Sequence, residues 1–488
     1  MSGSYYLLKV LGLSGIPRIV TFAVGIVSIP LVVRALGAEQ YGIYVYMQSA
    51  ASLIEIFASG GVGSAAGKSM AACRIERPGC LSHELQKWVR LQALVAFSLL
   101  IPILGIGYLA IGYIGFAGIS PVLFLMVGLS VYLSMATTFM RNVLQSLLAF
   151  RSLAGLDTFD SLSRNSVAIL VALLFPSALG LVIAGVICAL MADLVGIAII
   201  VRDLQKTKHE PSIDAARVSP LAMRPMLRDS LSFLGLIAAT RAYQALPNLL
   251  IQRMLGFHMV GIIGAFARIV EILALPFTVI GNAMMVRAQE VVASGMKAAR
   301  RYWDMLWRFV IVAFAGTISF FFLTERVAKV LLPAEPQAEM LFNILTPLIL
   351  LRIVSDLFAP ASDYVGGLRA RVFYLSACAV FQIPFIWLVV RYHGGVGTAV
   401  TLVVAQAAIV SGYLAIAHRS FFHGAHYALP RDVLVAAGVI VSAGVGALWV
   451  PQAARLPVFL AALSMFFAII PVLRRQYLSG RFLLVDFI

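Results

Sequence analysis

The 488-residue sequence has few charges, few cysteines and no long polar domain. Only 12% of its residues are charged and 61% are hydrophobic, whereas about a quarter of the residues of a soluble globular protein are charged. A chain with so few charges cannot cover its surface for contact with water, so most of that surface must face lipid. Ten-residue segments that alternate hydrophobic and polar residues are also missing, which argues against a membrane β-barrel.

Residue patterns that bind metals and cofactors are scarce as well. The four cysteines form no C-x-x-C pair, and we interpret them as reduced, structural thiols. His423 and His426 have a loose ligand spacing, but no cysteine or acidic cluster accompanies them. We therefore expect no metal and no other cofactor.

Long hydrophobic runs fill most of the chain. Runs of about 18–25 residues suit helices that cross a hydrocarbon core of roughly 30 Å, and they predict an all-α integral membrane protein with about fourteen transmembrane helices. The first run is longer than the core of a secretion signal, so we expect an uncleaved first span. The predicted spans cover residues 15–34, 43–66, 91–115, 121–140, 162–177, 181–201, 230–252, 260–285, 307–324, 340–365, 372–390, 397–417, 433–450 and 456–473.

Lysine and arginine gather on one side of this predicted topology. The side that contains both termini has 28 of the 37 Lys and Arg, the opposite side has six, and three lie within spans. Because Lys and Arg are retained in cytoplasmic loops, both termini are expected in the cytoplasm. The same asymmetry explains the net charge of +16. Short basic loops favour anionic membrane lipids as partners and give no reason to expect nucleic acid.

A short motif occurs twice. RALGAEQYG (residues 34–42) and RMLGFHMVG (residues 253–261) share the frame R-x-L-G-x4-G, with matched positions 219 residues apart. The first copy joins predicted spans one and two, and the second joins spans seven and eight. Glycines at such corners permit a tight turn or a close approach of helices. The equivalent placement indicates a duplication of six spans, with both copies in the same orientation about an axis along the membrane normal.

The duplication predicts the domain organisation. We expect an N-terminal six-helix lobe at residues 1–201, a cytoplasmic linker at 202–229, a C-terminal six-helix lobe at 230–417, and two extra transmembrane helices with a cytoplasmic tail at 418–488. Parallel repeats of this kind enclose a central cavity in transporters and open it to either side by rocking.

Three segments carry a resemblance to a known family: IVTFAVGIVSIPLVVRALGAEQYGIYVYMQSAASLIEIFASGGVGSA, LLIQRMLGFHMVGIIGAFARIVEILALPFTVI and VGGLRARVFYL. The chain resembles the bacterial polysaccharide and oligosaccharide (Wzx-type) flippases of the multidrug/oligosaccharidyl-lipid/polysaccharide exporter superfamily. The second corner departs from the first, since Ile262 and Ile263 follow Gly261 in place of a tyrosine pattern. The resemblance implies two six-helix lobes with two extra helices. It also implies transfer of undecaprenyl-diphosphate-linked sugars to the outer leaflet of the bacterial cytoplasmic membrane.

Rare charges inside the spans are the candidate site residues. A charge at bilayer depth costs about 2.5–3.5 kcal/mol on insertion scales, so it is expected to face a cavity or a partner. Arginine suits a diphosphate because its planar fork binds two oxygens and stays charged. The candidates for substrate binding are Arg241, Arg268, Arg352 and Arg18. The candidates for coupling H⁺ or Na⁺ are Glu271, Glu55, Asp193 and Asp356.

Several of these charges also have structural interpretations. Arg268 with Glu271, at i,i+3, and Arg352 with Asp356, at i,i+4, have spacings at which charges pair along one helix face. Similarly, Arg18 lies near a helix end, where it can extend to the headgroups, and Asp193 can hydrogen-bond a neighbouring helix. Arg241 has no acid within four residues on its helix, which makes it the strongest substrate candidate.

Other functions remain open from the sequence. A peptidoglycan-precursor (lipid II) flippase would also use intramembrane cations, and a multidrug or cation antiporter of the same superfamily would rely more on acidic groups. A membrane glycosyltransferase or polysaccharide polymerase needs a sizeable outer segment with catalytic groups, whereas every outer connection here is short. No nucleotide-binding P-loop is present either, so we expect a transporter and not an enzyme. Its expected partners are the lipid-linked oligosaccharide, a polysaccharide polymerase and export machinery.

Overall fold

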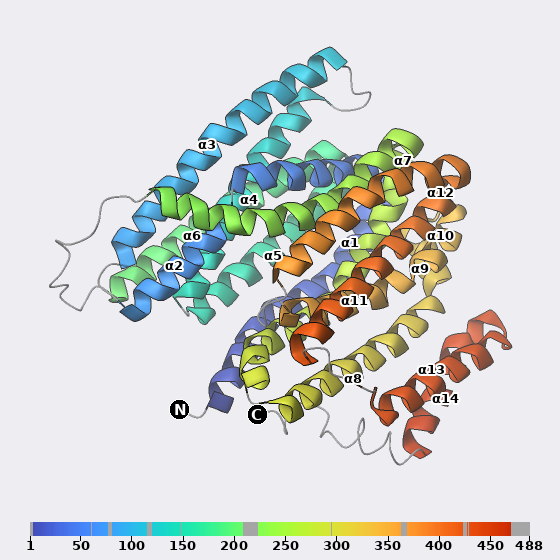
Figure 1. Cartoon of the computed structure of the whole chain (residues 1–488). Coiled ribbons are helices and arrows are strands. Elements are labelled where there is room, and N and C mark those ends of the chain that lie inside the picture. The colour runs from blue at the N-terminus through green and yellow to red at the C-terminus, as the bar shows by residue number, and fades with distance from the viewer. Residues whose placement is uncertain are drawn as a thin grey trace. The chain divides into compact units, whose positions relative to one another are not determined.

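The described chain is built from helices alone (Figure 1). A computed structural model describes residues 3–59, 61–76, 81–114, 120–147, 149–207, 223–293, 295–362, 368–422, 427 and 429–469. The predicted all-α class is confirmed, since these residues contain no strand. The helices are α1 (Gly3–Ser59), α2 (Val62–Glu76), α3 (Leu81–Ile114), α4 (Pro121–Ser146), α5 (Phe150–Leu174), α6 (Ala178–Thr207), α7 (Met223–Ala293), α8 (Met296–Phe321), α9 (Thr324–Leu331), α10 (Gln337–Leu345), α11 (Pro347–Ser362), α12 (Leu368–Phe422), α13 (Arg431–Leu448) and α14 (Gln452–Ile469).

Eight stretches of helix among the described residues are long and apolar enough to cross a membrane. Three helices, α1, α7 and α12, each run through two predicted spans and bend at a glycine between them. The predicted total of fourteen spans stays a prediction. The short span predicted at 162–177 differs most, because α5 begins at Phe150 and ends before Pro176. The first half of α5 is polar, which hid its length in the sequence.

The described contacts divide the chain into two compact units. We call residues 12–265 with 379–387 the N-terminal unit, and residues 1–11, 266–378 and 388–488 the C-terminal unit. The division falls within α7, whereas the predicted lobes meet at the linker 202–229. The lobe boundaries remain a prediction.

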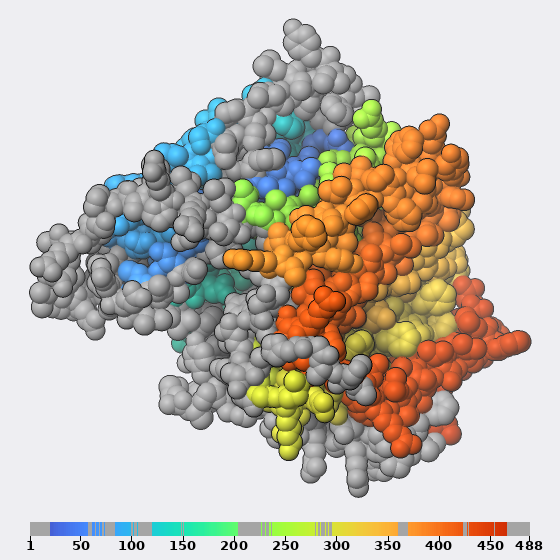
Figure 2. Space-filling model, in the orientation of Figure 1, coloured from blue at the N-terminus to red at the C-terminus, as the bar shows by residue number. Residues whose placement is uncertain are grey.

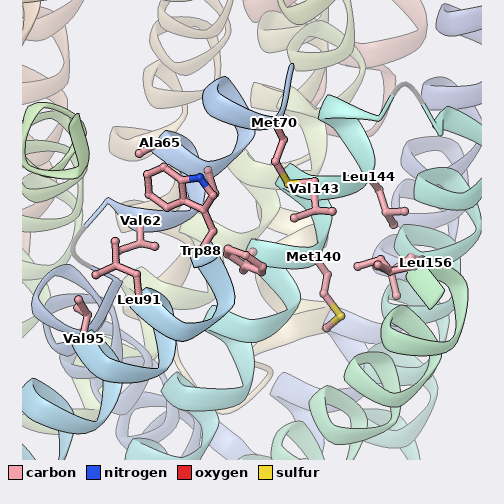
Figure 3. Packing of buried hydrophobic residues seen from close by; sticks show 13 residues of the cluster. Val62, Ala65, Met70, Trp88, Leu91, Val95, Met140, Val143, Leu144 and Leu156 are labelled. Atoms are coloured by element: carbon pink, nitrogen blue, oxygen red, sulfur yellow. The ribbon is translucent and has the colours of Figure 1, made fainter. Parts of the chain in front are cut away.

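The core of the N-terminal unit lies where α2, α3 and α4 pack together. Trp88 of α3 is 2% exposed and lies among Val62, Met70 and Val143 (Figure 3). Its indole nitrogen donates to Glu84 Oε1 at 3.0 Å, so the polar edge of the ring is paired while its apolar faces are buried. Helices α5 and α6 pack on each other and on α4, which completes the bundle around this core.

In the C-terminal unit, the last two helices pack on α8. Figure 1 shows α13 and α14 as a hairpin, and Figure 2 shows both at the surface in red. Arg308 of α8 donates to Asp432 of α13 at 3.0 Å. Beside this pair, Tyr427 donates to Asp304, and burial together with that carboxylate raises the pKa of the Tyr427 phenol. The neutral phenol and the ion pair therefore attach the hairpin to α8.

The first glycine of each repeated corner makes the turn. Gly37 has φ 71° and ψ 172°, and Gly256 has φ 82° and ψ 176°. The two positions are equivalent in the repeat and share one backbone conformation, at a positive φ that side chains other than glycine rarely adopt. The duplication seen in the sequence is thus present in the backbone geometry.

The second glycine of each corner packs on the other corner. A Cβ atom built on Gly42 would lie 1.8 Å from the carbonyl oxygen of Phe257, and one built on Gly261 would lie 1.8 Å from that of Ala38. Phe257 and Ala38 are themselves equivalent positions of the repeat. The contacts are therefore reciprocal, as an approximate two-fold axis through the N-terminal unit requires. Both copies of the R-x-L-G-x4-G motif need the second glycine, because each copy packs on the other.

Alanine at either second glycine should destabilise the protein. The Gly42→Ala and Gly261→Ala variants place a methyl group against a backbone carbonyl that cannot rotate away, and we expect each to cost about 1–3 kcal/mol. Thermal unfolding of the purified protein in detergent measures the loss. Gly185→Ala on α6 is the matched control, since its added Cβ meets nothing within 4 Å. Equal melting temperatures for all four proteins would contradict the close approach.

Candidate functional site

Arg241 forms an ion pair with Glu55. The Arg241 Nη2 and Glu55 Oε2 atoms lie 3.1 Å apart, with 38% of the arginine side chain and 15% of the glutamate side chain exposed. Arg241 belongs to the first half of α7, and Glu55 to the second half of α1. The sequence predicted both residues as site candidates, but it did not predict that they pair, because they are far apart in the chain.

The helices that carry this pair run antiparallel to each other. Asn248 of α7 donates to Ser49 Oγ of α1 at 2.9 Å. Gly61, just after α1, approaches Ser230 so closely that an added Cβ would lie 2.2 Å from its carbonyl oxygen. Contacts thus extend from the repeated corners past the Arg241–Glu55 pair to Gly61. The ion pair lies inside a continuous helix contact, with amide and hydroxyl groups one to two turns away.

A second arginine–carboxylate group lies in the C-terminal unit. Arg352 and Asp356 of α11 pair at 3.2 Å, as their i,i+4 spacing predicts. Thr278 of α7 donates to Asp356 Oδ2 at 2.9 Å. The arginine side chain is 38% exposed and the aspartate 14%. The carboxylate is fixed from two helices, whereas the guanidinium keeps accessible surface.

Arg268 and Glu271 form the most open pair. They lie on the second half of α7, and their side chains, joined at 2.6 Å, are 58% and 56% exposed. Their i,i+3 spacing predicted this contact. An exposed pair of this kind contributes little to stability, so its placement within a candidate span is the feature that needs an explanation.

Asp193 differs from the other three carboxylates. It is 5% exposed, and Oδ1 lies 2.6 Å from the hydroxyl oxygen of Thr137 on α4. The other oxygen, Oδ2, is buried and has no hydrogen-bond partner among the described residues. Contact with a neighbouring helix was one of the predicted roles, whereas the unpartnered oxygen was not foreseen.

The sequence did not predict a network of ion pairs that lies near Asp193. Arg141 of α4 donates to Asp157 at 2.7 Å and to Asp160 at 2.8 Å, and Arg164 donates to Asp160 at 2.6 Å. Asp160 is 8% exposed. The sequence predicts a cytoplasmic loop for Arg141, Asp157 and Asp160 and a span edge for Arg164. The i,i+4 spacing of Asp160 and Arg164 was the one available signal.

Two earlier expectations fall outside the described side chains. The side chain of Arg18 is not described, so its role stays a prediction, and the same holds for His423 and His426. The described residues contain no cluster of three potential metal ligands. The described site chemistry is that of guanidinium groups held by carboxylates, with hydroxyl and amide groups nearby.

Solved membrane transporters have the same fold. The lipid II flippase MurJ, in an inward closed conformation, matches with a TM-score of 0.69 at 12% identity, over 93% of this chain and 99% of that one. An inward-facing multidrug resistance MATE transporter matches with a TM-score of 0.60 at 15% identity, over 82% of this chain and 94% of that one. A MOP superfamily transporter from Pyrococcus furiosus matches with a TM-score of 0.60 at 15% identity, over 87% of this chain and 97% of that one. The chain therefore has the multi-pass helical fold of MOP-superfamily transporters.

The family follows from the sequence itself. The profile of the polysaccharide biosynthesis protein family matches residues 11–286, which is more than half of the chain. The chain belongs to that family, and the sequence-based resemblance is confirmed. Curated protein sequences give no match.

The Arg241–Glu55 pair should show energetic coupling. Removing one partner in Arg241→Gln or Glu55→Gln leaves the other charged at bilayer depth, whereas the double variant leaves neither. We expect the double variant to lose less stability than the two single losses together, by about 1 kcal/mol. Unfolding of all four proteins in detergent measures this coupling. Strictly additive losses would show that the pair contributes no interaction energy.

Proposed function

We propose that this protein flips undecaprenyl-diphosphate-linked oligosaccharide repeat units from the inner to the outer leaflet of the bacterial cytoplasmic membrane by alternating access. The product would supply cell-surface polysaccharide synthesis, such as that of exopolysaccharide or lipopolysaccharide. The observation that carries the proposal is that Arg241, in a member of a polysaccharide biosynthesis family, is paired within the span yet 38% exposed.

The exposure of these pairs supports a hydrated surface. An ion pair that faced hydrocarbon would carry a large desolvation cost. Arg241, Arg268 and Arg352 all have accessible side-chain surface within candidate spans. Water next to them removes that cost and leaves room for a polar substrate.

A diphosphate can replace the carboxylate at Arg241. Glu55 neutralises the guanidinium when no substrate is bound. A phosphate presents two oxygens to the arginine fork and carries a charge of the same sign as the carboxylate. The exchange therefore keeps the cation paired throughout. Substrate binding thus leaves no bare arginine, and it releases Glu55 from the contact between α1 and α7. The released carboxylate then needs water or a cation.

The remaining candidates take related roles in this proposal. Arg352 and Arg268 offer guanidinium groups to the diphosphate or to acidic sugars, and Arg18 attracts the phosphates near the cytoplasmic side. Asp356 and Glu271 return to their arginines as Glu55 does, and their release provides carboxylates for H⁺ or Na⁺. Asn248 and Ser49, paired beside the ion pair, have the amide and hydroxyl groups that bind sugar hydroxyls.

Two alternatives within the superfamily make different demands. A lipid II flippase handles the same lipid diphosphate. Lipid II and the oligosaccharide lipid therefore differ in the sugar part that the protein must recognise. A multidrug or cation antiporter needs carboxylates free to bind a cation. Glu55, Glu271 and Asp356 are each paired with an arginine, which favours an anionic substrate. A polymerase and export machinery would then receive the flipped units on the outer side.

Substitution of Arg241 should reduce flipping. A hydrogen-bonded contact to a charged group is worth about 1.5–3 kcal/mol, so we expect Arg241→Ala to slow transport by about tenfold or more. Arg241→Lys keeps the charge but lacks the fork, and we expect an intermediate rate. Vesicles that contain the purified protein and a lipid-diphosphate-linked oligosaccharide measure the rate as glycan becomes accessible outside.

Arg300→Ala, at an exposed position of α8, is the matched control for the removal of one arginine. If Arg241→Ala transports as fast as Arg300→Ala, Arg241 does not bind the substrate. Transport of lipid II in preference to the oligosaccharide lipid would replace the proposed substrate with the peptidoglycan precursor.

A further inference from the structure

Arg164 of α5 lies well inside its helix, although the function proposed above does not use it. It precedes Leu174, where α5 ends, by ten residues, or about 15 Å at 1.5 Å per residue. On the same count, Arg241 lies about 22 Å before the bend of α7 at Gly256. The Arg164 side chain is 39% exposed, close to the 38% of Arg241. Arg164 is therefore another accessible arginine far from the ends of its helix.

The accessible surface of Arg164 lies on the side of α5 opposite to its exposed leucines. Leu162, Leu170 and Leu173 are 40%, 56% and 61% exposed and lie along one face of the helix. At about 100° per residue, Arg164 is roughly 160° from Leu162 and roughly 180° from Leu173 around the helix axis. The leucines suit contact with lipid, whereas Arg164 faces the interior of the N-terminal unit. Accessible surface on that interior face is open to water and to a polar ligand.

Two carboxylates hold this guanidinium group and a second one in place. Asp160, 8% exposed, accepts from Arg164 Nε at 2.6 Å and from Arg141 Nη2 at 2.8 Å. Arg141 Nε also donates to Asp157 Oδ1 at 2.7 Å, and these two side chains are 36% and 30% exposed. Among the described residues, Arg164 is bonded through Nε alone. Both of its Nη groups and one oxygen of Asp157 thus remain as donors and an acceptor.

Hydroxyl and amide groups lie beside Arg164, toward α1. Ser161 and Asn165 are within about 100° of Arg164 around α5. The hydroxyl groups of Thr21 and Ser161 are 2.6 Å apart, and Ser28 donates to Asn165 Oδ1 at 3.0 Å. These contacts fix α1 against α5. They also place hydroxyl and amide groups within one turn of the guanidinium group.

The balance of charge favours sugar hydroxyls over a diphosphate at this surface. Two arginines face two aspartates, so the network has no surplus positive charge. Asp193, a further charged group within electrostatic reach, adds none. A diphosphate placed beside these carboxylates would be repelled. A sugar hydroxyl both donates and accepts, so neighbouring hydroxyls can donate to Asp157 and accept from Arg164.

We propose that the interior face of α5 around Arg164 and Asp157 is a glycan subsite, which deepens the transport function proposed above and rests on it. The subsite binds hydroxyl groups of the oligosaccharide, while Arg241 holds the diphosphate. Asp160 positions both guanidinium groups from its buried place between them. The sugar and phosphate parts of the substrate are then recognised by different arginines.

Binding of a free oligosaccharide tests the subsite. The probe is an uncharged oligosaccharide repeat unit released from its lipid diphosphate, and equilibrium dialysis with the purified protein in detergent measures its Kd. We expect Arg164→Gln to raise this Kd about tenfold, as the loss of a hydrogen bond to a charged group does. Arg164→Lys keeps a charge beside Asp160 but lacks the fork, so it should raise the Kd less.

Ser152→Ala is the matched control, because it removes a hydrogen bond from α5 to Asp203 of α6 without changing the interior face around Arg164. This variant should bind the oligosaccharide as the wild type does. Where Arg164→Gln does not fold, the Kd of Arg164→Lys decides. An unchanged Kd in the Arg164 variants, or no saturable binding by the wild type, would overturn the proposal.

Inorganic pyrophosphate separates sugar recognition from phosphate recognition. Arg164→Gln should bind pyrophosphate with the Kd of the wild type. Weaker binding of pyrophosphate together with unchanged binding of the oligosaccharide would make this surface a phosphate site and would overturn the glycan subsite.

Flipping in vesicles separates this inference from the proposed function. Arg164→Gln should raise the KM for the oligosaccharide lipid about tenfold, in line with its weaker binding. If the wild type binds the free oligosaccharide through Arg164 but flips no oligosaccharide lipid, the proposed function fails and the subsite stands. If the wild type flips the oligosaccharide lipid and Arg164→Gln has the same KM, the proposed function stands and the subsite is overturned.

Discussion

A charge inside the hydrocarbon layer must be paired, hydrated or neutralised, and this constraint accounts for the polar chemistry of the chain. The structure uses more than one solution. Arg241, Arg268 and Arg352 are paired and keep accessible surface. Arg141 and Arg164 balance two aspartates, Asp157 and Asp160, in a network on α4 and α5. Asp193 is 5% exposed, and its Oδ2 atom has no hydrogen-bond partner among the described residues. In the function proposed above, the first group of arginines exchanges ligands with the substrate, whereas the network of Arg141 and Arg164 supports the packing of α4 and α5.

The repeated corner shows how sequence and fold are connected. Gly37 and Gly256 supply the turn, while Gly42 and Gly261 allow two backbones to meet. Neither glycine tolerates a side chain, but for different reasons: the first for its φ angle, the second for lack of space. The second reason requires the other copy of the corner to be present. The two motifs, 219 residues apart, therefore indicate a duplication and also contact each other in the structure.

Sequence reasoning reached the features that repeat or act locally. Composition gave the membrane class, and the i,i+3 and i,i+4 spacings gave the pairs at Arg268 and Arg352. It could not find the partner of Arg241, because nothing local connects α7 to Glu55. It also predicted a loop at Asp157 and Asp160, because the first half of α5 is polar and does not look like a membrane helix. In the structure, Arg141 of α4 neutralises both aspartates. Long-range pairing changes both the apparent polarity and the role of a residue, and no single-sequence pattern encodes it.

The compact units and the sequence repeats do not coincide, which gives the Arg241–Glu55 pair its importance. The N-terminal unit extends to Ala265 and so includes the first half of α7, the opening helix of the second repeat. That helix contacts the second half of α1 through Glu55, Ser49 and the corner glycines. In the proposed function, exchange of Glu55 for a phosphate would therefore act on a contact between the two copies of the repeat, in addition to one side chain. A ligand at Arg241 would then alter the contact that joins the copies, and differential binding of this kind is what a ligand needs in order to shift a conformational equilibrium.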